Sequence, residues 1–84
     1  MDIHHRVEGL TADGAAAAHQ QDVAVQARYG VRFIRYWYDE RTGKVFCLSE
    51  APNPEAISAV HRAAHGILAD EIVEVTEGLE VLPA

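Results

Sequence analysis

The chain has 84 residues, 49% of them hydrophobic, which gives room for one small domain over residues 1–84. Its 7 basic residues are spread along the sequence and are outnumbered by 13 acidic ones, so the formal net charge is −6. Nucleic-acid binding, which needs a basic patch against the phosphates, is therefore not expected.

The N-terminal residues lack the basic and apolar regions of a signal peptide. No apolar run approaches the roughly 18 residues that a membrane span needs, so no membrane contact is expected. Residues 2–7 alternate instead, which predicts a strand. Ile3, His5 and Val7 share one side, which we expect to face the helices, and His4 points to the opposite face.

A helix is predicted next, because Thr11 is a suitable N-cap and an alanine-rich segment follows it. We expect this helix to continue to about Tyr29 and to end at Gly30. Residues 31–38 are rich in β-branched and aromatic side chains, which predicts the second strand. Residues 39–43 then form a hairpin connection with a glycine near its end.

The third strand is predicted over residues 44–50, and the prolines after it end the strand. Asn53 can cap a second helix that has Pro54 at its first position and ends at 65–66. A last strand covers about residues 72–76. The order βαββαβ predicts an α+β, ferredoxin-like fold, in which a four-stranded antiparallel sheet carries both helices on one face.

The second strand has large apolar side chains at both parities. Because side chains alternate along a strand, either Ile34, Tyr36 and Tyr38 or Phe33 and Trp37 must lie on the face that the helices leave open. A strand of this kind is buried on both sides. We therefore expect a homodimer packed sheet to sheet.

Five histidines in so short a chain are candidates for binding a transition metal, since imidazole suits such ions. His61 and His65 lie four residues apart on one flank of the second predicted helix, a spacing that can hold an ion from one side. The same pair also fits a boundary position, and His65 could instead complement the helix dipole. His4 and His5 point in opposite directions, so only one of them can join that pair.

Four further residues are candidate ligands or neighbours of an ion. Cys47 lies in the third strand, next to the first strand in this fold, and is either a thiolate ligand or a small buried hydrophobe. Tyr36 offers a hydroxyl group. His19 and Asp22, three residues apart, form either a second, more exposed ion site or, as we favour, a surface hydrogen bond.

Several segments resemble a family of small actinobacterial nickel-binding proteins that was long classed as a domain of unknown function. The resemblance covers about residues 2–77 and rests on four segments: GVRFIRYWYDE, VFCLSEAPNPEA, VHRAAHG and ADEIVEV. It implies a cytosolic, ferredoxin-like homodimer that binds nickel. The positions that carry over are Tyr36, Cys47, His61 and His65.

The leading hypothesis is a nickel-binding homodimer that buffers or carries the ion without catalysis. Zinc and copper should also bind such a site in vitro, as the Irving–Williams order implies. Affinity is expected to fall below about pH 6, because free histidines protonate near pH 6.5. Two alternatives stay open: a small dimeric monooxygenase or isomerase whose pocket is lined by His5, Tyr36 and His65, and an interaction module whose histidines sense pH.

Overall fold

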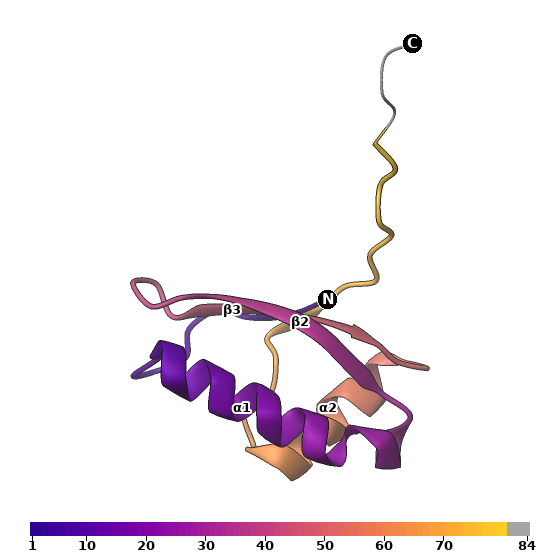
Figure 1. The fold of residues 1–84 in the computed structure, drawn as a ribbon, viewed down its shortest axis with the longest axis horizontal. Helices are drawn as coiled ribbons and strands as arrows, with labels where there is room; N and C mark the ends of the chain where they lie inside the picture. Colours follow the sequence, from indigo (N-terminus) through magenta and orange to yellow (C-terminus); the bar gives the residue numbers. More distant parts are fainter. Residues whose placement is uncertain (81–84) are drawn as a thin grey trace.

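The computed structural model describes residues 1–80 as a four-stranded sheet with two helices on one of its faces (Figure 1). The elements in chain order are β1 (Asp2–His4), α1 (Ala12–Val25), the 3₁₀ helix η1 (Gln26–Tyr29), β2 (Arg32–Asp39), β3 (Lys44–Glu50), α2 (Pro54–Ala64) and β4 (Glu71–Ile72). The sheet order is β2-β3-β1-β4, and all neighbouring strands are antiparallel. The α+β class, the antiparallel sheet and the one-sided helices are therefore confirmed, and the topology is ferredoxin-like.

The predicted starts of both helices and the stop at Gly30 are confirmed, and each depends on local structure. The Thr11 hydroxyl accepts a hydrogen bond from the Gly14 amide, and the Asn53 side chain accepts one from the Ala56 amide. Gly30 ends η1 with φ of 69°, a left-handed conformation that favours glycine. The predicted first helix is thus two elements, α1 and η1, before that glycine.

The first and the last strand are both shorter than the sequence predicts. The first strand ends at His4 rather than residue 7, because the His5 amide donates to the Asp70 carboxylate instead of to a neighbouring strand. The last strand spans Glu71–Ile72 rather than 72–76. Both strands are short, so they contribute few ladder hydrogen bonds.

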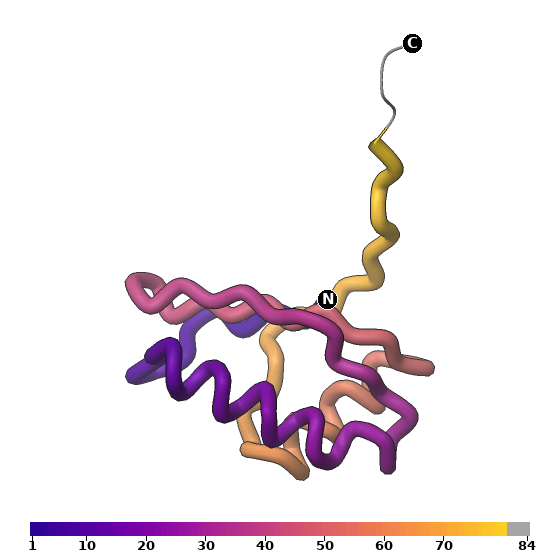
Figure 2. The backbone as a smooth tube through the Cα atoms, viewed as in Figure 1, coloured from indigo at the N-terminus to yellow at the C-terminus, as the bar shows by residue number. Residues whose placement is uncertain are grey.

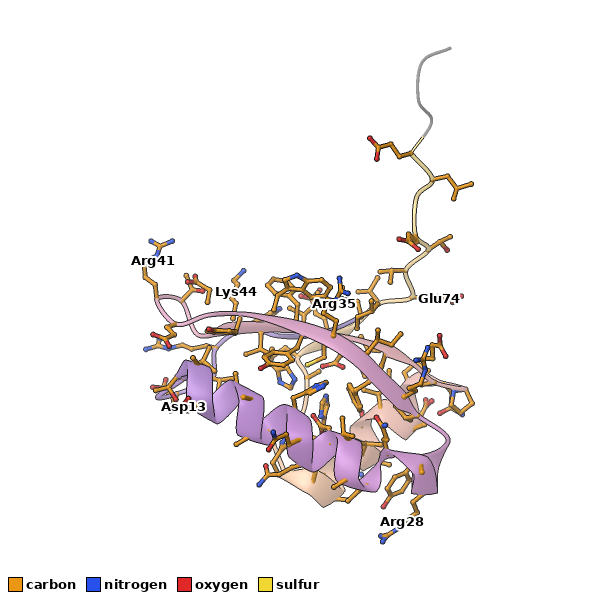
Figure 3. The ribbon with its side chains drawn as sticks, in the orientation of Figure 1. Asp13, Arg28, Arg35, Arg41, Lys44 and Glu74 are labelled. Atoms are coloured by element: carbon orange, nitrogen blue, oxygen red, sulfur yellow. The ribbon has the colours of Figure 1, made fainter. Side chains whose placement is uncertain are left out.

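The second strand does not alternate strictly, because a β-bulge lies between Phe33 and Arg35. The extra residue places Tyr36 opposite buried Cys47, on the helix-covered face, and Arg35 on the open face. Neither of the two predicted sets is correct: Phe33, Tyr36 and Tyr38 face the helices, and Trp37 is on the open side. In Figure 3 Arg35 and Lys44 also point away from the helices.

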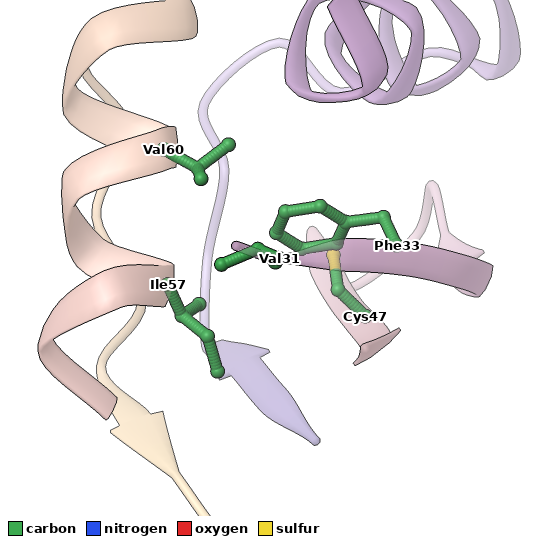
Figure 4. Close-up of a cluster of buried hydrophobic side chains, with 5 residues drawn as sticks. All are labelled: Val31, Phe33, Cys47, Ile57 and Val60. Carbon is green, nitrogen blue, oxygen red and sulfur yellow. The ribbon is translucent and has the colours of Figure 1, made fainter. Parts of the chain in front are cut away.

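The core lies between the sheet and α2 (Figure 4). Val31, Phe33, Cys47, Ile57 and Val60 are all buried, and Val60 has no exposed surface. The apolar stripe of α2 supplies the last two of these residues. This core is small, so a cluster of buried polar side chains beside it forms a large share of the interior.

The chain after β4 leaves the body on the side opposite the helices and extends away from it (Figure 2). The N-terminal amine of Met1 donates to the Val73 carbonyl, so the two ends of the fold lie together. Within residues 1–80, neither helix is long and apolar enough to cross a bilayer.

Candidate metal centre

Five side chains form one continuous chain of alternating imidazoles and carboxylates beneath the sheet. Its members in spatial order are His4, Asp2, His61, Asp22 and His65. The successive nitrogen–oxygen distances are 3.1, 3.0, 2.9 and 3.0 Å. His61 is the central member, because its Nε2 contacts Asp2 and its Nδ1 contacts Asp22. We call these five residues the His–Asp chain.

Three elements that are distant in sequence supply the His–Asp chain. β1 provides Asp2 and His4, which alternate with Ile3 and so lie on one face. α1 provides Asp22, and α2 provides His61. His65 is the C-cap residue of α2, one turn beyond His61, so the two rings lie 5.0 Å apart.

The burial of the His–Asp chain determines which of its side chains carry a proton. Asp2, Asp22 and His61 are 0%, 3% and 1% exposed. Burial by itself lowers the pKa of His61, but the hydrogen bonds and charges of the two aspartates outweigh it and raise the pKa to about 9. Burial raises the pKa values of both aspartates, yet their bonds to the histidines bring these values below the usual range. At neutral pH His61 is therefore an imidazolium that donates to two carboxylates.

Two atoms of the His–Asp chain are free to accept an ion. Asp2 Oδ2 and His4 Nδ1 are buried and have no hydrogen-bonding partner among the described residues. In a neutral ring, the His4 Nε2 hydrogen points to Asp2 Oδ1, which leaves the lone pair on Nδ1. A histidine held by a carboxylate in this way is the usual arrangement of a metal ligand. The residues present therefore fit a transition-metal ion.

Cys47 lies beside these two atoms, because it pairs with Asp2 across β3 and β1. Burial and the charges of Asp2 and Asp22 raise the pKa of the Cys47 thiol far above its usual value. The side chain is therefore a protonated thiol at neutral pH. It would become a thiolate only on binding an ion.

Two groups in the described part of the chain have the spacing of metal ligands, with donor atoms within 4.8 Å of one another. The first comprises Asp2, His4, Cys47 and His61, and the second comprises Asp22, His61 and His65. His61 belongs to both groups through its two ring nitrogens. The predicted pairing of His61 with His65 is thus present in the second group, but His61 lies in the interior and not on a flank of the helix.

The structure reverses the predicted roles of the two strand histidines. His4 is 5% exposed and faces the helices, whereas His5 is exposed and bonds the Glu71 carboxylate. The reason is that the polar face of β1 finds partners on α1 and α2, while Ile3 pairs with Phe46 toward the open face. The His5 side chain is therefore not a member of the His–Asp chain.

The predicted pair of His19 and Asp22 is also wrong. Asp22 turns inward to His61 and His65 and is buried. The ring of His19 instead packs on Tyr36, with ring centres 4.8 Å apart. Both aromatic residues line a cavity that reaches the His–Asp chain, and neither belongs to a group with ligand spacing in the described residues.

Sequence reasoning missed Asp2 as a candidate. One signal was available, because Asp2 shares its strand face with His4. A charged residue is seldom fully buried unless it is paired, so its partner had to be found first. That partner, His61, lies 59 residues away.

The fold and the His–Asp chain define a small ferredoxin-like α+β protein with a candidate metal-binding cluster. This protein belongs to the SCO4226-like nickel responsive protein family, whose model matches residues 1–75 of its sequence. This membership confirms the resemblance described above. The sequence is 42% identical to that of SCO4226 from Streptomyces coelicolor A3(2), and the structure matches the crystal structure of that protein with a TM-score of 0.85. The match covers 93% of this chain and 95% of the SCO4226 chain. No curated protein matches the sequence.

Proposed function

We propose that this protein binds one divalent transition-metal ion per chain, with nickel as the physiological ion, and holds and releases it without catalysis. The observation that carries the proposal is the pair of unpartnered buried atoms, Asp2 Oδ2 and His4 Nδ1, beside Cys47 and His61. Leaving such atoms unpaired in the interior is costly, and an ion would remove that cost. The nickel-responsive family supports the choice of ion.

The first group is the preferred site, because the second has a competing contact. His65 Nδ1 accepts the Ile67 amide, so the hydrogen of the neutral ring is on Nε2 and points to Asp22. That ring has no lone pair left for an ion. Asp22 instead orients His61 from the far side, as a carboxylate behind a ligating imidazole does.

The test is a metal titration of the untagged protein with Ni²⁺, Zn²⁺ and Cu²⁺, together with elemental analysis. We expect one ion per chain, and we expect His4→Ala and Cys47→Ser each to weaken nickel binding at least tenfold. His5→Ala is the matched control, since its ring is exposed on the same strand, and it should stay within about twofold. Circular dichroism checks that each variant is folded. Binding no tighter than about millimolar, or an unchanged His4→Ala, would contradict the proposal.

We also propose that the chain forms a homodimer through the open face of the sheet. Ile34 and Trp37 are 42% and 45% exposed there, large values for apolar side chains. A groove lined by this face and by residues 72–77 adds to the apolar area. Analytical ultracentrifugation should give twice the chain mass, and Trp37→Glu should give the mass of one chain. A wild-type monomer at tens of micromolar would contradict this arrangement.

The alternative of a small enzyme has one favourable feature, the cavity that Tyr36 and His65 line. His5, the third residue expected in such a pocket, lies outside it. His61 is protonated between two carboxylates, so the centre of the site carries no free base at neutral pH. Binding without catalysis therefore has the stronger support.

A further inference from the structure

A cavity of about 200 Å³ opens between α1, the loop over residues 7–11 and the helix-covered face of the sheet. Small and apolar side chains form most of its wall: Val7, Leu10, Ala15, Ala18, Val45 and Ile67. At its inner end it reaches His4, Cys47 and His61 of the preferred group, together with Asp22 and His65 of the second group. The cavity thus has a mostly apolar wall, with candidate metal ligands at its inner end.

This space is larger than an ion requires. A water molecule takes about 30 Å³ in the liquid, so the cavity, which is open to solvent on one side, has room for several waters. An ion held by three or four protein atoms would keep two or three waters, which fill less than half of that volume. The remaining space would be water against an apolar wall, which an organic group fills more favourably.

The charges of the site limit the class of organic group. The two buried aspartates carry two negative charges and the Cys47 thiolate would add a third, so a divalent ion leaves no positive charge to spare at the site. A polycarboxylate or a phosphate would add several buried negative charges beside them, at high cost. A chelator that presents one nitrogen and one oxygen and carries at most one negative charge keeps this cost lower.

We propose that the cavity binds a small N,O-chelator with a hydrocarbon side chain, of the α-amino acid class, as a co-ligand of the bound nickel. This inference rests on the proposed function. The amine and carboxylate of the co-ligand would bind the metal from the side of the cavity, and the ammonium proton would go to solvent. Its side chain lies against Leu10, Ala15 and Ala18. These alanines, three residues apart on one face of α1, leave the room for it.

The test compares two probes with the same donor atoms. Nickel-loaded protein is titrated with L-leucine and with glycine, which differ by one apolar side chain. We expect leucine to bind at least tenfold more tightly, because its side chain leaves water. Equal affinities within twofold would overturn the inference, as would removal of the nickel by leucine on dialysis. In both cases nickel binding itself would stand, whereas failure to load nickel would reject the proposed function first.

Variants of α1 assign the effect to the cavity. Ala18→Leu and the larger Ala18→Phe should remove the preference for leucine, because their side chains occupy the same space. Nickel affinity in the absence of amino acids should change by less than threefold, which also shows that the variants fold. Ala17→Phe is the matched control on the exposed side of α1 and should keep the preference. A preference that survives both Ala18 variants would contradict binding in this cavity.

Discussion

Replacing His61 with alanine should lower the free energy of unfolding of the metal-free protein by about 3–5 kcal/mol. The variant leaves Asp2 and Asp22 buried on either side of a gap, with no cation between them. Such a loss is a large part of the stability of a domain of this size. Urea denaturation followed by circular dichroism measures it.

Two further variants separate the cause of that loss. His5→Ala removes an exposed contact with Glu71 and should cost less than about 1 kcal/mol. Adding Asp2→Asn and Asp22→Asn to His61→Ala should restore part of the stability, because no uncompensated charge is then buried. If His61→Ala lowers the free energy of unfolding by less than about 1 kcal/mol, the His61 ring does not stabilise the buried Asp2 and Asp22 carboxylates.

Nickel affinity should rise at least tenfold per pH unit from about pH 6.5 to pH 9, and more slowly above pH 9, where the Cys47 thiol still has a proton to lose. The raised pKa of His61, about 9, means that the ring is protonated over this range and that nickel must displace the proton. Lowering the pH favours the protonated ring of His61 and therefore weakens nickel binding. The sequence alone placed this change near pH 6, because it assumed free histidines.

Isothermal titration in buffers with different ionisation enthalpies measures both parts of this expectation. Near pH 7.5 at least one proton should be released per nickel bound, and deprotonation of the Cys47 thiol would add a second. Affinity that levels off already at pH 7, with no proton released, would contradict ligation through His61. The Cys47→Ser variant tests whether the second proton comes from the thiol.

The local features of the fold could be predicted from sequence. Thr11, Gly30 and Asn53 mark helix ends through contacts with residues close in the chain, so short segments contain the whole signal. The order of elements followed from these marks and from the β-rich segments between them. The pairing of β1 with β3, and hence the closeness of Cys47 to β1, followed from the topology.

The candidate site could be predicted only in part, because its polar residues are buried by partners far away in sequence. The rule that apolar side chains face the interior placed Ile3 and His5 inward, and the structure shows Asp2 and His4 there instead. No local pattern reports that His61 supplies a cation between two aspartates. The bulge near Arg35 likewise changes which side chains of β2 face the helices, and no glycine in the sequence indicates it.

The proton on His61 bears on whether the fold depends on a bound ion. Many small metal domains are unfolded until their ion arrives, since nothing else balances the charges of their ligands. Here the proton on His61 places one positive charge between the two aspartates, so the protein supplies part of the balancing charge before any ion binds. On the proposed function, we therefore expect nickel to bind and leave in exchange for that proton while the chain stays folded.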